Sequence, residues 1–504
     1  MNGVAHASID PTSKQPELKA MAVRVEPVRD EAVATATRSR AARRLVVVGT
    51  GMAALAVVEE LLRRDPRWTV TMLGEEPGPV YNRMLLSKLL AGDAGEGDLQ
   101  LRPGAWYAQR GIDLRDSCRA VAIDTEARTV SDERGETHRY DALVVATGSR
   151  PFVPPIAGAD LPHVRVFRTR ADVAALGSSR RAVVLGGGLL GLEAAAGLRG
   201  RGRHVTVVEA APLLMGRQLD AGAAAMLEAQ LARRGIANHL GRAASEITRD
   251  AVVLDDGTKL AADTVVVAAG VRPETGLARS AGLSVARGIE VDDAMRADAS
   301  AVWAVGECAE HRGTVHGLWA PLAEQARVAG AGIAGDPAAF HGAVAATTLK
   351  VAGIDLYAGG RADALDGDDE VVLRDTRRGI YRKLVLRGDR VVGALLLGDL
   401  TDARRCSSAL RGEIEADALL AAGAPATEPD AVVCSCNDVT AAAIDEAIRA
   451  RGLTTVAQVA NATRATTGCG GCAYDVRALL DRHSSSARNT NDQDAKPLPA
   501  TIAP

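Results

Sequence analysis

The sequence predicts an α/β protein with two parallel-sheet units, followed by a small α+β domain and a short helical module. Short apolar runs alternate with helical patterns from residue 45 onward, which is typical of parallel sheets. Two of these runs lead directly into glycine-rich turns, at residues 49–54 and 186–191. Four cysteines gather near the C-terminus, at positions 434, 436, 469 and 472, and mark the helical module.

Bulk properties exclude several classes of protein. At 504 residues the chain is too long for a single core, and the usual domain size predicts three or four domains. The formal net charge of −3 gives no electrostatic reason to expect a nucleic acid or an anionic membrane as partner. The sequence shows neither an apolar run long enough to cross a bilayer nor the apolar core of a secretory signal. Seven cysteines, four of them clustered, favour a cytoplasmic protein with a metal site over a disulfide framework.

The first glycine-rich turn has the spacing of a dinucleotide-binding fingerprint. Gly49 permits a tight turn, Gly51 lets the backbone approach a pyrophosphate, and Ala54 is small enough for close packing of helix on strand. The following helix would direct its N-terminus at the phosphates. Glu75 ends the next predicted strand, 26 residues after Gly49, and can bind a ribose hydroxyl. A lone motif of this kind is a weak signal, so its context decides its meaning.

Two later strand ends supply that context. Residues 146–148 (Ala-Thr-Gly) close one strand, and residues 302–307 (Val-Trp-Ala-Val-Gly-Glu) close another. A flavoprotein of the glutathione-reductase type needs both elements, and its late carboxylate binds the ribityl chain. We therefore predict FAD at the first turn and assign the ribityl contact to Glu307. For residues 306–307 taken alone, a simple turn is the alternative.

The second glycine-rich turn carries a complete fingerprint, with Gly186, Gly188 and Gly191 in place. Its next strand ends in Glu209, 23 residues after Gly186. An acidic side chain there can accept hydrogen bonds from the adenosine ribose and repels the 2′-phosphate of NADP, so NADH is favoured over NADPH. The nearby Arg217 could tolerate that phosphate if it turned inward. We therefore predict two Rossmann-like domains, the first for FAD and the second for NAD.

The cysteine module pairs Cys434 with Cys436 and Cys469 with Cys472. Four thiolates in two close pairs select zinc or an iron–sulfur cluster. Zinc sites usually separate the members of a pair by two to four residues, so the single residue between Cys434 and Cys436 favours a [2Fe–2S] cluster. A neighbouring flavin also gives such a cluster a redox partner. Short helices are expected around these cysteines, over residues 440–451, over residues 455–463 and after Cys472.

The other three cysteines stand alone and are interpreted as packing residues: Cys118, Cys308 and Cys406. Cys308 follows Glu307 and would lie near the flavin, but a single thiol cannot form a disulfide pair. No Cys-x4-Cys sequence follows the first turn, so the dithiol relay of disulfide reductases is absent. Electrons must therefore leave the flavin directly.

These elements define the expected order of domains. The ends and the connection are expected to lack a fold of their own: a disordered extension (1–43), a linker (416–429) and a disordered tail (484–504). The folded parts are an FAD-binding domain (44–160 and 284–340), a NAD-binding domain (161–283), an α+β interface domain (341–415) and a [2Fe–2S] domain (430–483).

Three further runs carry a resemblance to a known family: residues 74–88 (Gly-Glu-Glu-Pro-Gly-Pro-Val-Tyr-Asn-Arg-Met-Leu-Leu-Ser-Lys), 214–220 and 305–313. Together with the Bfd-like (bacterioferritin-associated ferredoxin) cysteine module, they resemble the N-terminal half of the NADH-dependent assimilatory nitrite reductase large subunit. They also resemble the related electron-transfer subunit of assimilatory nitrate reductase. The likeness spans about residues 44 to 480, and its motifs are specific in combination.

The resemblance implies roles for individual residues. Lys88 would lie near the flavin N5 and pair with Glu193, and Arg150 would help to bind FAD. The helix that starts near Pro321 would point its N-terminus at the pyrimidine edge of the flavin. Taken alone, Lys88 is more often a solvated lysine, and Arg150 is as readily a turn residue.

The resemblance also implies a function, an NADH:acceptor oxidoreductase with FAD and one [2Fe–2S] cluster. The expected acceptor is the catalytic subunit of a molybdenum-dependent assimilatory nitrate reductase, and a separate nitrite reductase is the second candidate. A ferredoxin- or rubredoxin-type acceptor is less favoured, and a redox-sensing flavoprotein with little turnover is an alternative of another class. The sirohaem and [4Fe–4S] domain of nitrite reductases needs four further cysteines, and none follows Cys472, so we expect no nitrite reduction by this chain itself. The sequence leaves the oligomeric state open.

Overall fold

The computed structural model describes residues 43–177, 179–344, 346–351, 353–420, 431–434, 437, 439–467 and 471–492. Most of the predicted N-terminal extension, the rest of the linker beyond residue 420, and two of the four clustered cysteines, Cys436 and Cys469, lie outside these residues. The described residues belong to one compact unit that begins at residue 43. Helix α13 (Ala473–Asp492) continues past residue 483, where the tail was expected to begin.

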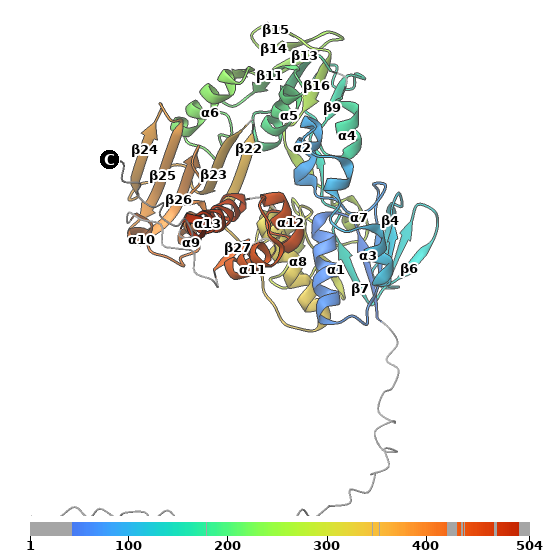
Figure 1. The fold of residues 1–504 in the computed structure, drawn as a ribbon. Helices are drawn as coiled ribbons and strands as arrows, with labels where there is room; N and C mark the ends of the chain where they lie inside the picture. Colours follow the sequence, from blue (N-terminus) through green and yellow to red (C-terminus); the bar gives the residue numbers. More distant parts are fainter. Residues whose placement is uncertain are drawn as a thin grey trace, which may run out of the picture. The chain divides into compact units, whose positions relative to one another are not determined.

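The first parallel sheet has the strand order β19-β7-β1-β2-β3. Its strands are β1 (Arg44–Val48), β2 (Thr69–Leu73), β3 (Ile112–Arg115), β7 (Ala142–Val145) and β19 (Val302–Ala304). All four strand pairings are parallel, and the apolar runs of β1 and β7 are buried. Helices α1 (Met52–Arg64) and α8 (Trp319–Ala334) pack against each other in the same core (Figure 1). Strand β1 thus delivers the first glycine-rich turn to the carboxyl edge of the sheet.

Smaller elements complete the first unit, the part of the protein that is built on this parallel sheet. The second unit is the part that is built on the second parallel sheet. Between β2 and β3 lie η1 (Arg83–Leu85), α2 (Leu86–Ala91), η2 (Glu96–Leu99) and α3 (Gly104–Gln109). An antiparallel sheet follows, with β4 (Ala120–Asp124), β5 (Thr129–Asp132) and β6 (Thr137–Arg139). The third sheet of this unit, also small, comes much later in the chain and contains β18 (Ile289–Val291), β20 (Ala309–His311) and β21 (Thr314–Val315).

The second parallel sheet has the order β12-β11-β10-β16-β9. Its strands are β9 (Val164–Val166), β10 (Arg181–Leu185), β11 (His204–Glu209), β12 (Ile236–Leu240) and β16 (Thr264–Val267). Its other elements are α4 (Arg170–Ala175), α5 (Leu189–Gly200), α6 (Ala221–Arg233) and the antiparallel strands β13 (Ala244–Ile247), β14 (Ala251–Leu254) and β15 (Lys259–Ala261). The duplicated turns therefore belong to duplicated sheets, because β10 precedes the second turn as β1 precedes the first.

The chain crosses between the two units twice, and a short ladder joins the crossing strands. This ladder pairs β8 (Ser149–Pro151) with β17 (Val271–Pro273) in antiparallel fashion. After β17 the chain returns to the first unit, because Ala278 of α7 (Gly276–Ser280) and Leu283 pack in the first core. Helix α2 packs against α5 across the two units, and Leu90 lies close to Gly197. This contact joins the first unit to the second.

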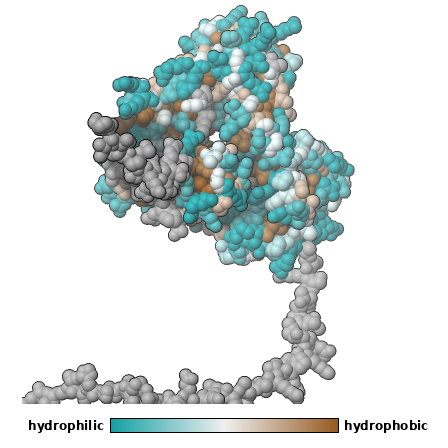
Figure 2. Space-filling model, in the orientation of Figure 1, coloured by the Kyte–Doolittle hydropathy of each residue, from teal (hydrophilic) through white to brown (hydrophobic). Residues whose placement is uncertain are grey.

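The α+β domain is built on an antiparallel sheet of order β22-β23-β26-β25-β24. Its elements are β22 (Ala346–Val351), β23 (Ile354–Gly360), β24 (Asp369–Asp375), β25 (Ile380–Arg387), β26 (Arg390–Leu397), α9 (Ala403–Leu410) and α10 (Ala416–Leu420). One face of the sheet packs with α9, and the other joins the core of the second unit. Within the part of the chain that the structure describes, no helix is long and apolar enough to cross a membrane. Hydrophilic residues dominate the face drawn in Figure 2.

The C-terminal module consists of short elements around the cysteines. They are β27 (Val432–Cys434), β28 (Val439–Thr440), α11 (Ala441–Arg451), α12 (Val456–Thr463) and α13. Thr440 and Thr455 cap the N-termini of α11 and α12 through their hydroxyl groups, and Gly452 ends α11 in the left-handed conformation. Local capping residues thus set both helices where the sequence predicts them.

Candidate functional site

A cavity of about 1530 Å³ lies at the carboxyl edge of the first sheet. It collects every residue that the sequence assigns to FAD, from five separate segments of the chain: Gly49, Gly51, Ala54, Glu75, Lys88, Arg150 and Glu307. Glu193, from the second unit, lies in the same wall. These assignments stay predictions about ligand contacts, but the residues all line one cavity.

The backbone of the first turn fits a dinucleotide pyrophosphate. Gly49 has a φ of +112°, and a Cβ added there would lie 2.1 Å from the carbonyl oxygen of Ala146, so only glycine allows this close approach. A Cβ on Gly51 would meet no atom within 4 Å, so this position opens into free space. Ala54 is fully buried between helix and strand. The turn thus brings α1 and bare backbone to the cavity wall, as phosphate binding requires.

The two carboxylates assigned to FAD, Glu75 and Glu307, each pair with an arginine. Arg150 pairs with Glu75 at 3.2 Å and also with Glu274, and these pairs raise the pKa of Arg150. Glu307 accepts a hydrogen bond from the Ser149 hydroxyl at 2.8 Å and pairs with Arg168. Arg150 therefore lies beside the carboxylate assigned to the ribose.

Lys88 and Glu193 do not form the predicted ion pair. Both side chains belong to described residues, and among these no ion pair joins them. Burial raises the pKa of Glu193 to about 7, with no contribution from a neighbouring charge. Lys88 lies in α2 and Glu193 in α5, and these helices pack against each other. The two helices are therefore neighbours as expected, but burial raises the pKa of the Glu193 carboxyl group to about 7 and no ion pair with Lys88 forms.

Helix α8 begins at Trp319, two residues before the expected start near Pro321, and residues 318–322 line the cavity. Its N-terminal end therefore faces the cavity, as the resemblance implies. Sequence reasoning missed other parts of the wall, because no local pattern marks them: Arg119, Val121, His316, Thr347, Val456, Thr466 and Ala473. The last three belong to the cysteine module, so this module contributes directly to the cavity.

The second turn has the backbone of a nucleotide site; its residues Leu189 and Leu190 line this cavity, whereas its three fingerprint glycines do not. Gly186 has a φ of +119°, and a Cβ on Gly191 would lie 1.9 Å from the carbonyl oxygen of Gly186. A Cβ on Gly188 would meet no atom within 4 Å. Glu209 accepts hydrogen bonds from the backbone N–H groups of Gly187 at 2.6 Å and Ala211 at 2.8 Å. These bonds fix the carboxylate beside the turn, where a ribose would lie.

The described cysteines of the module fit an iron–sulfur ligand set. A hydrogen bond with the Cys472 thiol is the main cause that lowers the pKa of Cys434 to about 6, which favours the thiolate that such a cluster requires. The backbone N–H of Thr466 donates to the Cys472 sulfur at 3.2 Å, and the Asn437 amide lies 3.7 Å from the Cys434 sulfur. Donors of this kind stabilise thiolate ligands. The other two predicted ligands, Cys436 and Cys469, lie outside the described residues.

The isolated cysteines are buried, and burial raises the pKa of each thiol: Cys118, Cys308 and Cys406. For Cys406 the pKa reaches about 12. The Cys308 thiol contacts the carbonyl oxygens of Val145 and Val305. A buried, neutral thiol is a poor nucleophile, so these residues fit a packing role.

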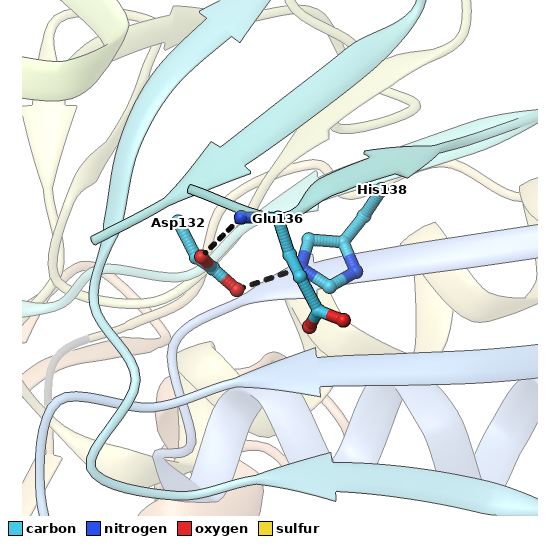
Figure 3. Close-up of side chains that lie close together, drawn as sticks. All are labelled: Asp132, Glu136 and His138. Carbon is cyan, nitrogen blue, oxygen red and sulfur yellow. Dashed lines mark hydrogen bonds and ion pairs between the residues drawn. The ribbon is translucent and has the colours of Figure 1, made fainter. Parts of the chain in front are cut away.

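A group of possible metal ligands, Asp132, Glu136 and His138, lies in the β5–β6 hairpin (Figure 3). Hydrogen bonds within the hairpin account for the positions of Asp132 and His138. Asp132 Oδ1 accepts from the backbone N–H groups of Arg134 and Glu136, and Oδ2 contacts His138 Nε2 at 2.9 Å. The His138 bond is the main cause that lowers the pKa of Asp132. Asp132 therefore closes the hairpin turn, and its oxygens are already bonded.

Three family models match this chain. Residues 43–332 match the pyridine nucleotide-disulphide oxidoreductases, residues 346–414 the C-terminal domain of rubredoxin NAD+ reductase, and residues 432–482 the BFD-like [2Fe–2S]-binding domain. These matches confirm the predicted α/β fold class, the oxidoreductase class and the predicted cofactors, FAD, NADH and a [2Fe–2S] cluster.

Two relatives from Bacillus subtilis (strain 168) each align with 87 % of this chain. An NAD(P)H nitrite reductase is 39 % identical, and an assimilatory nitrate reductase electron transfer subunit is 38 % identical. The chain spans only 57 % and 59 % of their lengths. Among solved structures, the covalent putidaredoxin reductase–putidaredoxin complex matches with a TM-score of 0.70 at 27 % identity, covering 76 % of this chain and 97 % of that one.

Proposed function

Since this chain belongs to the pyridine nucleotide-disulphide oxidoreductase family, we propose that it carries electrons from NADH through FAD and a [2Fe–2S] cluster to the catalytic subunit of a nitrate reductase. One observation carries the proposal: residues of the cysteine module line the same cavity as the predicted FAD contacts. When bound, FAD would accept electrons from NADH in pairs and release them singly to the cluster. The module would therefore receive electrons at the cavity itself.

The residues of the first unit would bind and orient FAD. Gly51 leaves room for the pyrophosphate, and the N-terminus of α1 faces it. Glu75 would accept hydrogen bonds from the adenosine ribose, with Arg150 holding it in place. Glu307, fixed by Arg168 and Ser149, would accept from the ribityl hydroxyls. Each acidic side chain is thus oriented before the cofactor binds, which lowers the entropic cost of binding.

The residues of the second unit would bind NADH. The turn at Gly186, Gly188 and Gly191 would admit the pyrophosphate, and Glu209 would accept from the ribose hydroxyls. Lys88 and Glu193 would act where the two nucleotides meet, since α2 and α5 bring one residue from each unit into the cavity wall. Lys88 would supply positive charge beside the flavin, and Glu193 would hold a proton near neutral pH.

The electron exit would run through the module, because no Cys-x4-Cys dithiol follows the first glycine-rich turn to take electrons from the flavin. Cys308 is the cysteine nearest the ribityl carboxylate in sequence, and its thiol is buried and neutral. A single inert thiol cannot pass electrons by disulfide exchange. We place the reaction in the cytoplasm, because the three isolated cysteines, Cys118, Cys308 and Cys406, are free thiols and the four clustered cysteines are assigned to a cluster rather than to disulfides.

The acceptor is the part of the proposal that depends most on the relatives. The electron transfer subunit of an assimilatory nitrate reductase resembles this chain along 87 % of its length, which favours nitrate reductase. A nitrite reductase aligns over the same share at 39 % identity, so a separate nitrite reductase is the second candidate. Both would receive single electrons from the cluster. Direct assay with each purified acceptor distinguishes them.

The first test is an anaerobic titration of the purified protein with NADH, followed by optical and low-temperature EPR spectra. The proposal predicts bleaching of the flavin absorbance and an S = ½ signal from a reduced [2Fe–2S] cluster. Flavin bleaching without such a signal, together with zinc in the metal analysis, would refute the relay. A redox sensor with little turnover would instead show slow NADH-driven dye reduction and cluster-dependent binding to a partner.

A further inference from the structure

Asn82 connects the wall of the flavin cavity with the cysteine module. Its side chain is buried, with 2 % of the residue exposed, and both ends of its amide are bonded. The Oδ1 atom accepts from the backbone N–H of Met84 at 3.0 Å and thereby caps η1, which leads into the helix that carries Lys88. The Nδ2 atom donates to the backbone carbonyl of Thr467 at 2.6 Å, across 385 positions of sequence.

The loop that Asn82 contacts, residues 464–467, also contacts the cluster ligands. The Thr466 N–H donates to the Cys472 sulfur at 3.2 Å. Asn437, whose amide approaches the Cys434 sulfur, also donates to the Arg464 carbonyl at 2.8 Å. The docking loop, as we name residues 464–467, is therefore bonded to the surroundings of both described ligands.

A second contact holds the docking loop on the first unit. Arg464 pairs with Glu59 of α1 at 3.5 Å, and Arg102 pairs with the same carboxylate at 2.6 Å. Arg464 is 45 % exposed, so this pair alone contributes little. The hydrogen bond of Asn82 contributes more, because Asn82 is buried and its amide, left without the Thr467 carbonyl, would be desolvated without compensation.

The conformation of the docking loop also indicates a functional constraint. Thr466 has a φ of +69°, which a β-branched residue rarely adopts. Backbone of this kind is held in place by its surroundings and clusters at functional sites. Here it directs the Thr466 N–H at the Cys472 sulfur while the same residue lines the cavity.

We propose that Asn82 is a positioning residue for electron exit, which holds the docking loop, and with it the cluster ligands, against the wall of the flavin cavity. The proposal deepens the function above and depends on it for the electron flow. The docked geometry itself depends only on this chain's residues. Electron transfer between two bound groups slows as their separation grows, so loss of the Asn82 contact slows transfer to the cluster without changing the NADH site.

The variant Asn82→Asp separates the two roles of this side chain. Aspartate keeps the oxygen that caps η1, so the helix with Lys88 stays in place. It loses the donor to Thr467 and presents a second oxygen to that carbonyl. The charge reversal Arg464→Glu tests the same interface from the module side, since it repels Glu59. Thr401→Ala is the matched control, because its hydroxyl contacts Tyr474 of the module at a different surface.

Hydrogen–deuterium exchange of the holoprotein gives the readout that requires no turnover. The amides of the docking loop are all bonded inside the module: Arg464 to Ala460, Ala465 to Thr463, Thr466 to Cys472 and Thr467 to Arg464. In Asn82→Asp their exchange should quicken about fivefold, the factor that one hydrogen bond represents. Thr401→Ala should leave it unchanged. Unchanged exchange in both Asn82→Asp and Arg464→Glu overturns the proposal.

Stopped-flow spectroscopy then separates this proposal from the function on which it rests. Reduction of the flavin by NADH should change less than twofold in Asn82→Asp, while reduction of the cluster slows about fivefold or more. If NADH fails to reduce the wild-type flavin, the proposed function is wrong, and the exchange data still decide the docking. If wild type reduces its cluster and both interface variants do so equally fast, the role of Asn82 in electron exit is refuted.

Discussion

The resemblance implies an ion pair between Glu193 and Lys88, whereas the structure gives Glu193 a raised pKa and no such pair. The protonation of Glu193 therefore distinguishes the two. Burial raises its pKa to about 7 from an ordinary 4.5. Between these two values the folded protein keeps a proton that the unfolded chain releases. The free energy of unfolding therefore falls as pH rises through this window, and the penalty is complete above pH 7.

The magnitude follows from the shift. One pKa unit corresponds to about 1.4 kcal/mol, so a rise from 4.5 to about 7 destabilises the ionised protein by about 3 kcal/mol. Glu193→Gln removes the titration. We expect the variant to gain up to about 3 kcal/mol over wild type at pH 8 and less than about 1 kcal/mol at pH 5. Any fixed cost of burying the amide is the same at both pH values and cancels in the comparison.

The assay is thermal unfolding of the oxidised holoprotein at pH 5 and pH 8, for wild type, Glu193→Gln and Lys88→Met. A change of 1 kcal/mol shifts the midpoint of a domain of 150–250 residues by about 2–4 °C. Lys88→Met is the matched control, because it removes the predicted partner of Glu193. The structure predicts that it leaves the pH dependence unchanged.

The opposite pattern would refute this reasoning. An ion pair with Lys88 would hold the pKa of Glu193 at or below its ordinary value. In that case Glu193→Gln would destabilise the protein equally at pH 5 and pH 8, and Lys88→Met would steepen the loss of stability above pH 5. Either result would restore the pair that the sequence resemblance implies.

Three further predictions follow from described contacts. Lys383 is buried and pairs with Asp220 at 3.0 Å, so Lys383→Met should cost about 3–5 kcal/mol in thermal unfolding, and adding Asp220→Asn should restore part of the loss. Gly191→Ala, whose Cβ would meet backbone, should abolish NADH binding in calorimetry while FAD is retained, whereas Gly188→Ala should fold normally and bind NADH more weakly. Cys406, with its pKa raised to about 12, should resist iodoacetamide at pH 8 in the native protein and react after denaturation, as seen by mass spectrometry.

Local signals predicted the parts of the fold that depend on neighbouring residues. The two glycine-rich turns follow buried strands, because a tight turn and a bare backbone each require glycine at fixed offsets. The capping threonines and Gly452 likewise set α11 and α12 where the pattern predicts them. Pairings between distant segments carry no such signal. The parallel pairing of β9 with β16, and of β19 with β7, emerges only when the chain folds.

The candidate site shows the same difference between local signals, which the sequence reveals, and contacts between distant segments, which it does not. Glycines and carboxylates at fixed distances from a turn were predictable, and the cavity collects those of the first turn. The partners of those carboxylates were not, since Glu307 meets Arg168 and Glu75 meets Arg150 from segments far apart in sequence. The contact between Asn82 and Thr467 is the extreme case, because each residue lies in a segment whose own pattern gives no reason to expect the other.

Glu193 differs from the other carboxyl groups of the cavity wall in how its charge is compensated. The carboxylates assigned to FAD are compensated by arginines, Glu307 by Arg168 and Glu75 by Arg150. Glu193 has no such partner among the described residues, and burial raises its pKa to about 7, so the carboxyl group is only partly ionised near neutral pH. Below this pKa the carboxyl group is neutral and adds no negative charge to the cavity wall that Lys88 also lines, which lowers the repulsion of an anionic group such as a phosphate or a reduced flavin ring.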